Sequence, residues 1–169
     1  MKVTSYGSLL KVCKDLLHEK IPIIDMLTII EAVADIAEFT KVPEILLEHV
    51  RAKLYRLITQ KYKDTDGVLH IITIKPELEQ QFIGKLQEHH GVSQLMISIA
   101  EINNLVTKTK KLLDDIEAKG FSKITMVVDP VLRKRISEIY EKFGLQVSVL
   151  SHAELDSKAN FAIEGTLEF

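Results

Sequence analysis

The fold is decided by residues 19–51, EKIPIIDMLTIIEAVADIAEFTKVPEILLEHVR. Within this stretch, residues 26–39 have the spacing of a helix whose polar side chains share one stripe, three and four positions apart: Thr28, Glu31, Asp35 and Glu38. Almost every other position is apolar, and a helix that is apolar over most of its circumference is normally surrounded by neighbours. We therefore expect this helix at the centre of an all-helical unit, with Ile30 buried opposite the polar stripe.

Prolines and a capping aspartate divide this unit into three helices. Pro22 is expected to end a first helix that starts near Ser8, because proline lacks an amide hydrogen and disfavours helix at the preceding residue. Asp25 is predicted to cap the central helix. Pro43 is predicted to open a third helix that runs to about Gln60, since proline is tolerated in the first helical turn.

A polar segment, residues 61–67, separates the helical unit from a second part of the chain, and we expect it to be an open joint and the first site of proteolysis. Beyond it, β-branched segments alternate with helices, which is typical of a small, mostly parallel sheet covered by helices. Four strands are predicted, at residues 68–74, 124–128, 146–150 and 160–166. The predicted fold class is mixed α+β and α/β: an all-helical subdomain, residues 1–66, and an α/β subdomain, residues 67–169.

Within the second part, a capping box at Ser98 and Glu101 is predicted to open a helix that stops at Gly120. Another helix is predicted to begin at Asp129-Pro130. Residues 89–91 are predicted to be a loop, followed by a short extended piece at residues 95–97.

Composition limits the class of protein. The 169 residues are 46% hydrophobic with a net charge of −2, which is typical of a folded globular chain. The single cysteine, Cys13, excludes an internal disulfide and a cysteine metal cluster, and it fits a reducing compartment. The sequence has no apolar run of eighteen residues and no signal-peptide pattern, so we expect a cytoplasmic chain. Because Lys and Arg are dispersed, nucleic acid is not expected as the main partner.

Side chains that could carry chemistry have simpler interpretations. Asp129 follows a predicted strand, where α/β sheets often hold ligands, but Asp followed by Pro is also the pattern of a helix cap, which we favour. The adjacent His89 and His90 diverge and lack a third ligand, so a solvated loop is predicted instead of a metal site. Glycine-rich phosphate loops and nucleophile elbows are absent from the sequence. We expect no catalytic residue, cofactor or metal.

Ordered motifs along the chain provide a resemblance. They are Ile21-Pro22-Ile23-x-Asp25, Thr28-Ile29-Ile30-Glu31-Ala32, Thr40-Lys41-x-Pro43, Glu48-His49-Val50-Arg51, Ile72-Thr73-Ile74-x-Pro76, Val127-Val128-x-Pro130-x-Leu132-Arg133 and Val149-Leu150-Ser151-x-x-Glu154. As an ordered set they resemble the C-terminal cytoplasmic region of the FHIPEP (FlhA-like) family of flagellar and type III secretion export gate proteins, and the flagellar branch in particular. The chain departs from the family at Val42 and Lys75, where an acidic residue often precedes the proline, and this weakens two helix caps.

The resemblance implies a docking and ring-assembly module and not an enzyme. The parent protein forms a ring of nine copies beneath the bacterial inner membrane. Its partners are the other gate subunits, export chaperone–substrate complexes and components of the export ATPase complex. The chain corresponds to the last two cytoplasmic subdomains, and it reaches the membrane only through an N-terminal region that is missing here.

The resemblance also places ring contacts largely in the helical subdomain. There we expect the charged residues Glu48 and Arg51 at a protein interface; the alternative is a surface ion pair between them, worth about 0.2–0.5 kcal/mol. An apolar patch is expected beside the family's preceding subdomains, on the first helix and the turn after it, at Leu10, Ile21, Ile23 and Ile24.

Two other functions stay open. A flavodoxin-like domain that binds a small ligand, or acts as an enzyme, would need a polar pocket at the carboxyl ends of the strands. A helical nucleic-acid-binding module would need a coherent basic face over residues 43–61, which Glu44 and Glu48 interrupt.

Overall fold

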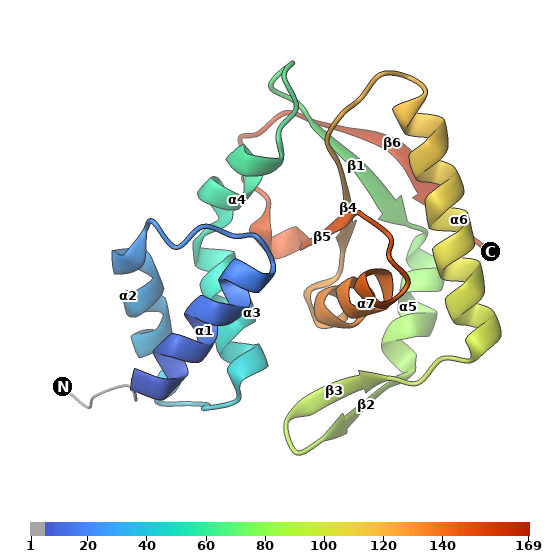
Figure 1. Cartoon of the computed structure of the whole chain (residues 1–169). Coiled ribbons are helices and arrows are strands. Elements are labelled where there is room, and N and C mark those ends of the chain that lie inside the picture. Colours follow the sequence, from blue (N-terminus) through green and yellow to red (C-terminus); the bar gives the residue numbers. More distant parts are fainter. Residues whose placement is uncertain (1–5) are drawn as a thin grey trace. The chain divides into compact units, whose positions relative to one another are not determined.

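The computed structural model describes residues 6–169, which divide into two compact units (Figure 1). The first unit extends to Ile58 and the second begins at Thr59, so the boundary lies within a helix, before the joint expected at residues 61–67. The hydroxyl of Thr59 explains this position, because it donates to the carbonyl of Glu154 and accepts from the amide of Asp156, both at 3.0 Å. These bonds tie the end of the helix to the second unit.

The helical unit contains α1 (Tyr6–His18), α2 (Met26–Ala37), α3 (Pro43–Lys53) and the start of α4 (Tyr55–Tyr62). The predicted caps are confirmed: the carboxylate of Asp25 accepts from the amide of Thr28 at 3.2 Å, and Pro43 opens α3. The single third helix predicted to reach Gln60 is wrong. It is interrupted at Leu54, whose amide is shared between two carbonyl groups in a tightened last turn.

The expected centre of the helical unit is also wrong. Helix α3 packs against both α1 and α2, whereas α2 buries only Ile29, Ala32 and Val33. The side chains of Leu27 and Ile30 are 68% and 45% exposed. With so few helices in the unit, α2 has neighbours on one side only, and an apolar circumference cannot be covered within it.

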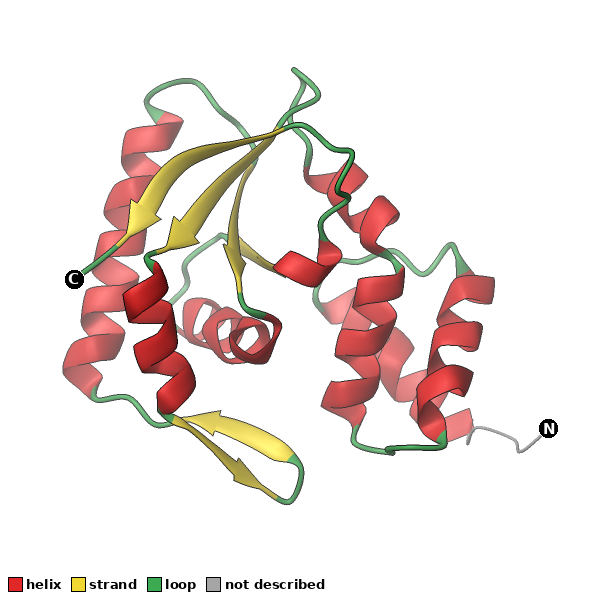
Figure 2. Cartoon of the chain, turned by 180° about the vertical axis from the view of Figure 1, so that it is seen from behind, coloured by secondary structure: helices red, strands yellow, loops and turns green. Residues whose placement is uncertain are grey.

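The α/β unit is built on a parallel four-stranded sheet, as predicted (strands yellow in Figure 2). The strand order is β5 (Ser148–Ser151), β4 (Ile124–Val128), β1 (Leu69–Ile74) and β6 (Phe161–Leu167). Helices α5 (Pro76–Gly84), α6 (Ile99–Glu117) and α7 (Pro130–Lys142) contribute Phe82, Ile116 and Tyr140 to one core together with Ile72 and Met126 of the sheet. The predicted end of α6 is confirmed by Gly120, at φ +94°.

One part of this unit differs from the prediction. The segment around the loop predicted at residues 89–91 forms an antiparallel hairpin of β2 (Leu86–His89) and β3 (Val92–Leu95). Its two-residue turn has His90 and Gly91 at positive φ, 53° and 80°, as a primed hairpin turn requires. Histidine is uncommon in the first position of such a turn, so the sequence did not indicate it. A short 3₁₀ helix, η1 (His152–Glu154), follows β5.

Across residues 6–169, none of the helices has both the length and the apolar character that a membrane crossing requires.

Candidate functional site

The residues predicted at a protein interface fall into two groups. Ile21 and Arg51 are buried, whereas Ile24 is 82% exposed and Ile23 and Glu48 are partly accessible. The expected exposure is therefore wrong for the first two. Interface roles for Ile23, Ile24 and Glu48 stay predictions. Ile21 and Arg51 are buried within the helical unit, and this burial gives both residues a structural role.

The burial of the charged Arg51 side chain is explained by an ion pair that the sequence did not predict. Its guanidinium Nη1 lies 2.5 Å from Oε2 of Glu19, and the two side chains are only 2% and 9% exposed. Glu19 follows α1, so the pair fastens α3 to the end of the first helix. A solvent-exposed pair with Glu48, the alternative expected from the sequence, would stabilise the fold far less. A buried charge, in contrast, depends strongly on its partner.

An exposed apolar and acidic surface runs along α2. We call it the α2 face: Ile24, Leu27, Ile30, Glu31 and Asp35, all exposed. Its aliphatic side chains are Ile24, which precedes the cap residue Asp25, and Leu27 and Ile30, which are one helical turn apart in α2, whereas Ile29 and Val33 pack inward. Contiguous apolar side chains on a folded protein mark sites of protein–protein contact when they are rimmed by charge.

The side chains considered for catalysis are engaged within the fold. The carboxylate of Asp129 accepts from the amide of Val131 at 3.0 Å, which confirms the predicted cap, and the amide of Asp129 donates to Glu79. Burial raises the pKa of the Cys13 thiol, which disfavours the reactive thiolate. In the part of the chain that the structure describes, no three His, Cys, Asp or Glu side chains are grouped to hold a metal ion.

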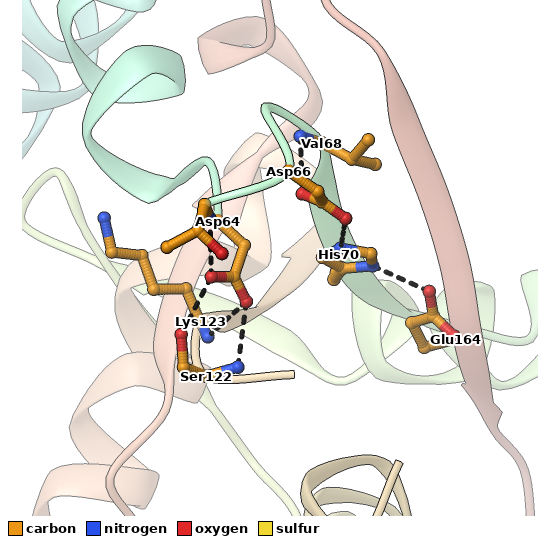
Figure 3. A network of polar contacts seen from close by, with 8 residues as sticks. Asp64, Asp66, Val68, His70, Ser122, Lys123 and Glu164 are labelled. Atoms are coloured by element: carbon orange, nitrogen blue, oxygen red, sulfur yellow. Dashed lines mark hydrogen bonds and ion pairs between the residues drawn. The ribbon is translucent and has the colours of Figure 1, made fainter. Parts of the chain in front are cut away.

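The joint after α4 is held by a polar network (Figure 3). The carboxylate of Asp64 accepts from the amide and the hydroxyl of Ser122, both at 2.8 Å, and from the amide of Lys123 at 3.2 Å. The ammonium of Lys123 donates in return to the carbonyls of Lys61 and Lys63. Hydrogen bonds from the backbone of Thr65 and from Ser122 hold the pKa of Asp64 well below its usual range. The segment expected to be open is therefore anchored to the start of β4.

Beside this anchor, a histidine lies between two carboxylates (Figure 3). The buried ring of His70, in β1, has Nε2 2.8 Å from Oδ2 of Asp66 and Nδ1 2.7 Å from Oε1 of Glu164. Burial alone lowers the pKa of His70, but the hydrogen bonds and charges of Glu164 and Asp66 outweigh it and raise the pKa above 6.5. Because both ring nitrogens face carboxylates, neither is available to act as a general base toward a substrate.

Sequence reasoning missed this cluster. Asp66 was identified only as part of a turn, and His70 and Glu164 are separated by 94 positions. Only the register of β1 against β6 brings them together. The one signal available was the two-residue period of a strand, which places His70 on the same face of β1 as Ile72.

Comparison with known proteins identifies the class to which this chain belongs. The sequence model of the FHIPEP family matches residues 1–160, and the chain belongs to that family. This confirms the resemblance carried by the motifs.

The individual relatives are flagellar. Flagellar biosynthesis protein FlhA of Helicobacter pylori (strain J99) is 40% identical over 162 residues, which are 95% of this chain and 22% of that protein. FlhA of Escherichia coli (strain K12) is 30% identical over 165 residues, 98% of this chain and 23% of that protein. The chain thus spans less than a quarter of the length of these relatives.

Solved structures share the fold. The nonameric EPEC SctV-C structure superposes with a TM-score of 0.83 at 21% identity, covering 95% of this chain and 48% of that one. The Chlamydia pneumoniae CdsV and CdsO protein complex gives a TM-score of 0.82 at 20% identity, covering 96% and 47%. At these identities the likeness establishes the fold alone.

Proposed function

We propose that this chain is a cytoplasmic docking and ring-assembly module of a flagellar type III protein export gate, and that it acts by binding proteins and not as an enzyme. The family and its FlhA relatives support the export gate, and the flagellar relatives support the flagellar branch. Its partners are other gate subunits, export chaperone–substrate complexes and components of the export ATPase complex. Solved relatives described as nonameric, as a cytosolic domain, or as a complex with a second protein support assembly and docking on this fold.

The observation that carries this proposal is the α2 face. Its aliphatic side chains are exposed although they lie in a helix whose composition is typical of buried helices. The acidic residues Glu31 and Asp35 lie beside them, so the preferred partner surface combines an apolar contact with basic side chains. Ile23 and Glu48 extend the same proposal to the neighbouring turn and to α3.

The test is a double substitution, Ile24→Ser with Leu27→Ser, placed in the full-length gate protein. Both side chains are exposed, so the free energy of unfolding should change by about 0.5 kcal/mol or less. Export of flagellar subunits into the medium should fall at least about tenfold, because central apolar anchors carry most of the energy of an interface. Crosslinking between gate subunits in membranes identifies whether ring contacts are the step that is lost.

A control is Val131→Ser, which removes an aliphatic side chain that is 51% exposed from the start of α7. It should leave export unchanged. Normal export by the double variant would contradict a docking role for the α2 face. Arg51 and Ile21 are unsuitable for this experiment, since substitution of a buried residue alters the fold together with any contact.

A further inference from the structure

The docking proposal makes no use of His70, the buried ionisable side chain between Asp66 and Glu164. Its two carboxylates come from different elements: Asp66 from the turn that joins α4 to β1, and Glu164 from the edge strand β6. The pairing of β1 with β6 shifts register between Ile71 and Ile72, which leaves Glu164 as the extra residue of a bulge. Bulges re-aim side chains, and here the bulge directs Glu164 to the ring nitrogen.

The geometry determines how many protons the ring carries. A neutral imidazole has one N–H, whereas both nitrogens of His70 lie within 2.8 Å of carboxylate oxygens, which only accept hydrogen bonds when ionised. With both carboxylates ionised, the two hydrogen bonds can be made together only when both nitrogens donate, that is, by an imidazolium. The ring of Phe121 stacks on it at a centroid distance of 3.9 Å, which further favours a cation.

The surroundings contain few other charges. Asp66 faces the ring from the turn and Glu164 from β6, while Phe121 and the register partner Ile124 on the β4 side are apolar. Asp64 is the next carboxylate, and it acts by repulsion on Asp66. Loss of the proton from His70 would therefore leave two carboxylates around a neutral ring.

The two carboxylates would respond differently to that loss. A neutral ring donates only one hydrogen bond, and its other nitrogen then presents a lone pair to a carboxylate at less than 3 Å. The side chain of Asp66 is 47% exposed and that of Glu164 is 15% exposed. Asp66 can turn into water, whereas Glu164 would lose its partner in a site that water reaches poorly. The remaining bond should stay with Glu164.

We propose that His70 is a proton-dependent clasp: the protonated ring holds Asp66, in the turn of residues 65–67, against the sheet, and loss of the proton releases Asp66 while the Asp64 anchor and the pairing of β6 stay in place. The clasp thus links proton concentration to the stiffness of the connection between α4 and β1. Because the pKa of His70 is raised in the folded chain, protonation of this ring stabilises the fold. This stabilisation is complete below pH 6.5 and is lost as the pH rises through the raised pKa. This inference is independent of the docking role.

The test is an NMR titration of the 169-residue chain, following the His70 ring and two backbone amides. The amide of Val68 donates to Asp66 and reports the clasp, whereas the amide of Ser122 donates to Asp64 and reports the neighbouring anchor. The His70 midpoint should lie above 6.5. Across it, hydrogen-exchange protection of Val68 should fall at least about tenfold after correction for intrinsic base catalysis, with Ser122 unchanged.

Two variants sharpen the result. His70→Gln can donate to one carboxylate but does not titrate, so the pH-dependent loss at Val68 should disappear. Asp66→Asn removes one negative charge and should lower the His70 midpoint. A wild-type midpoint at or below 6.5 would overturn the clasp, as would an equal loss of protection at Ser122 or a loss at Val68 that persists in His70→Gln. The wild-type titration decides the first two outcomes even where a variant does not fold.

Discussion

The helical unit and the α/β unit differ in how completely they bury their apolar residues. In the α/β unit, one side of the sheet and three helices enclose a continuous core, and its buried Tyr140 hydroxyl is bonded to Thr109 at 2.8 Å. In the helical unit, α3 alone is well covered, α2 exposes its aliphatic side chains, and a buried ion pair joins α1 to α3. The α/β unit therefore encloses the larger core, whereas the helical unit leaves Leu27 and Ile30 of α2 exposed, where we propose a docking surface.

The largest effect is expected in the core of the α/β unit. Phe82→Ala empties a buried aromatic site between helix and sheet and should lower the free energy of unfolding by about 3–5 kcal/mol. Denaturant unfolding, followed by hydrogen exchange of β4 amides, measures it for this unit alone. Phe143→Ala, at a half-exposed aromatic residue, is the control and should cost well under half as much. A loss below about 1 kcal/mol for Phe82→Ala would mean that this core is loosely packed.

The next effect concerns the ion pair of the helical unit. Glu19→Gln removes one charge of the buried pair with Arg51 and should destabilise this unit by about 3 kcal/mol, because neutralising one partner of a buried ion pair is strongly destabilising. Exchange of α3 amides under increasing denaturant gives the value. Asp15→Asn, which breaks the more exposed pair with Lys11, is the matched control and should change stability by about 0.5 kcal/mol or less. Equal effects would show that burial adds nothing to the Arg51 pair.

A smaller effect is expected at the start of α6. The carboxylate of Glu101 accepts hydrogen bonds from Lys85 and Ser98, which lower its pKa to about 2, and the Ser98 hydroxyl accepts from the amide of Glu101. Ser98→Ala should cost about 1 kcal/mol and should raise the pKa of Glu101 toward its ordinary value. The ionised carboxylate of Glu101 stabilises the fold. This stabilisation is present above pH 4.5 and is lost as the pH falls toward 2. Carboxyl NMR titration measures the pKa of Glu101; an unchanged value would leave Lys85 and the backbone amide of residue 98 as the causes of its lowering.

The smallest effect is expected on the α2 face. Leu27→Ala removes an exposed side chain and should alter the stability of the helical unit by less than about 0.5 kcal/mol. Ile29→Ala, two positions along the same helix but buried, should cost about 2–5 kcal/mol. Thermal and denaturant melts of this pair of variants test the contrast directly. Similar losses for both would mean that α2 is covered on both sides, and the comparison between the units would fail.

Local chemistry made much of the fold predictable. Asp25, Ser98 and Asp129 cap helices as predicted, and the β-branched segments form the parallel sheet. These features depend on residues close together in the sequence. The break at Leu54 could not be predicted in the same way, because neither proline nor glycine marks it.

The errors at α2 and His70 have a different origin. The apolar pattern of α2 correctly predicts a helix that favours burial, but the pattern cannot say whether the cover comes from the same chain. The His70 cluster depends on strand register across 94 positions and on a bulge, and neither is encoded by spacing. Of the surface that we propose for docking, the sequence therefore predicted only Ile24 as a contact residue, and it predicted burial for Ile30, which is exposed, and contact roles for Ile21 and Arg51, which are buried.

The strand order of the sheet has a consequence for biosynthesis. Strand β1, the first to leave the ribosome, lies between β4 and β6, and its partner β6 is the last of the four to emerge. The apolar face of β1 therefore stays incompletely covered while about 90 further residues are translated, which at 5–20 residues per second takes roughly 5–20 seconds. The helical unit, whose contacts are local, can fold during this delay. During synthesis, the α/β unit is thus the one that is exposed longest to aggregation and to chaperones.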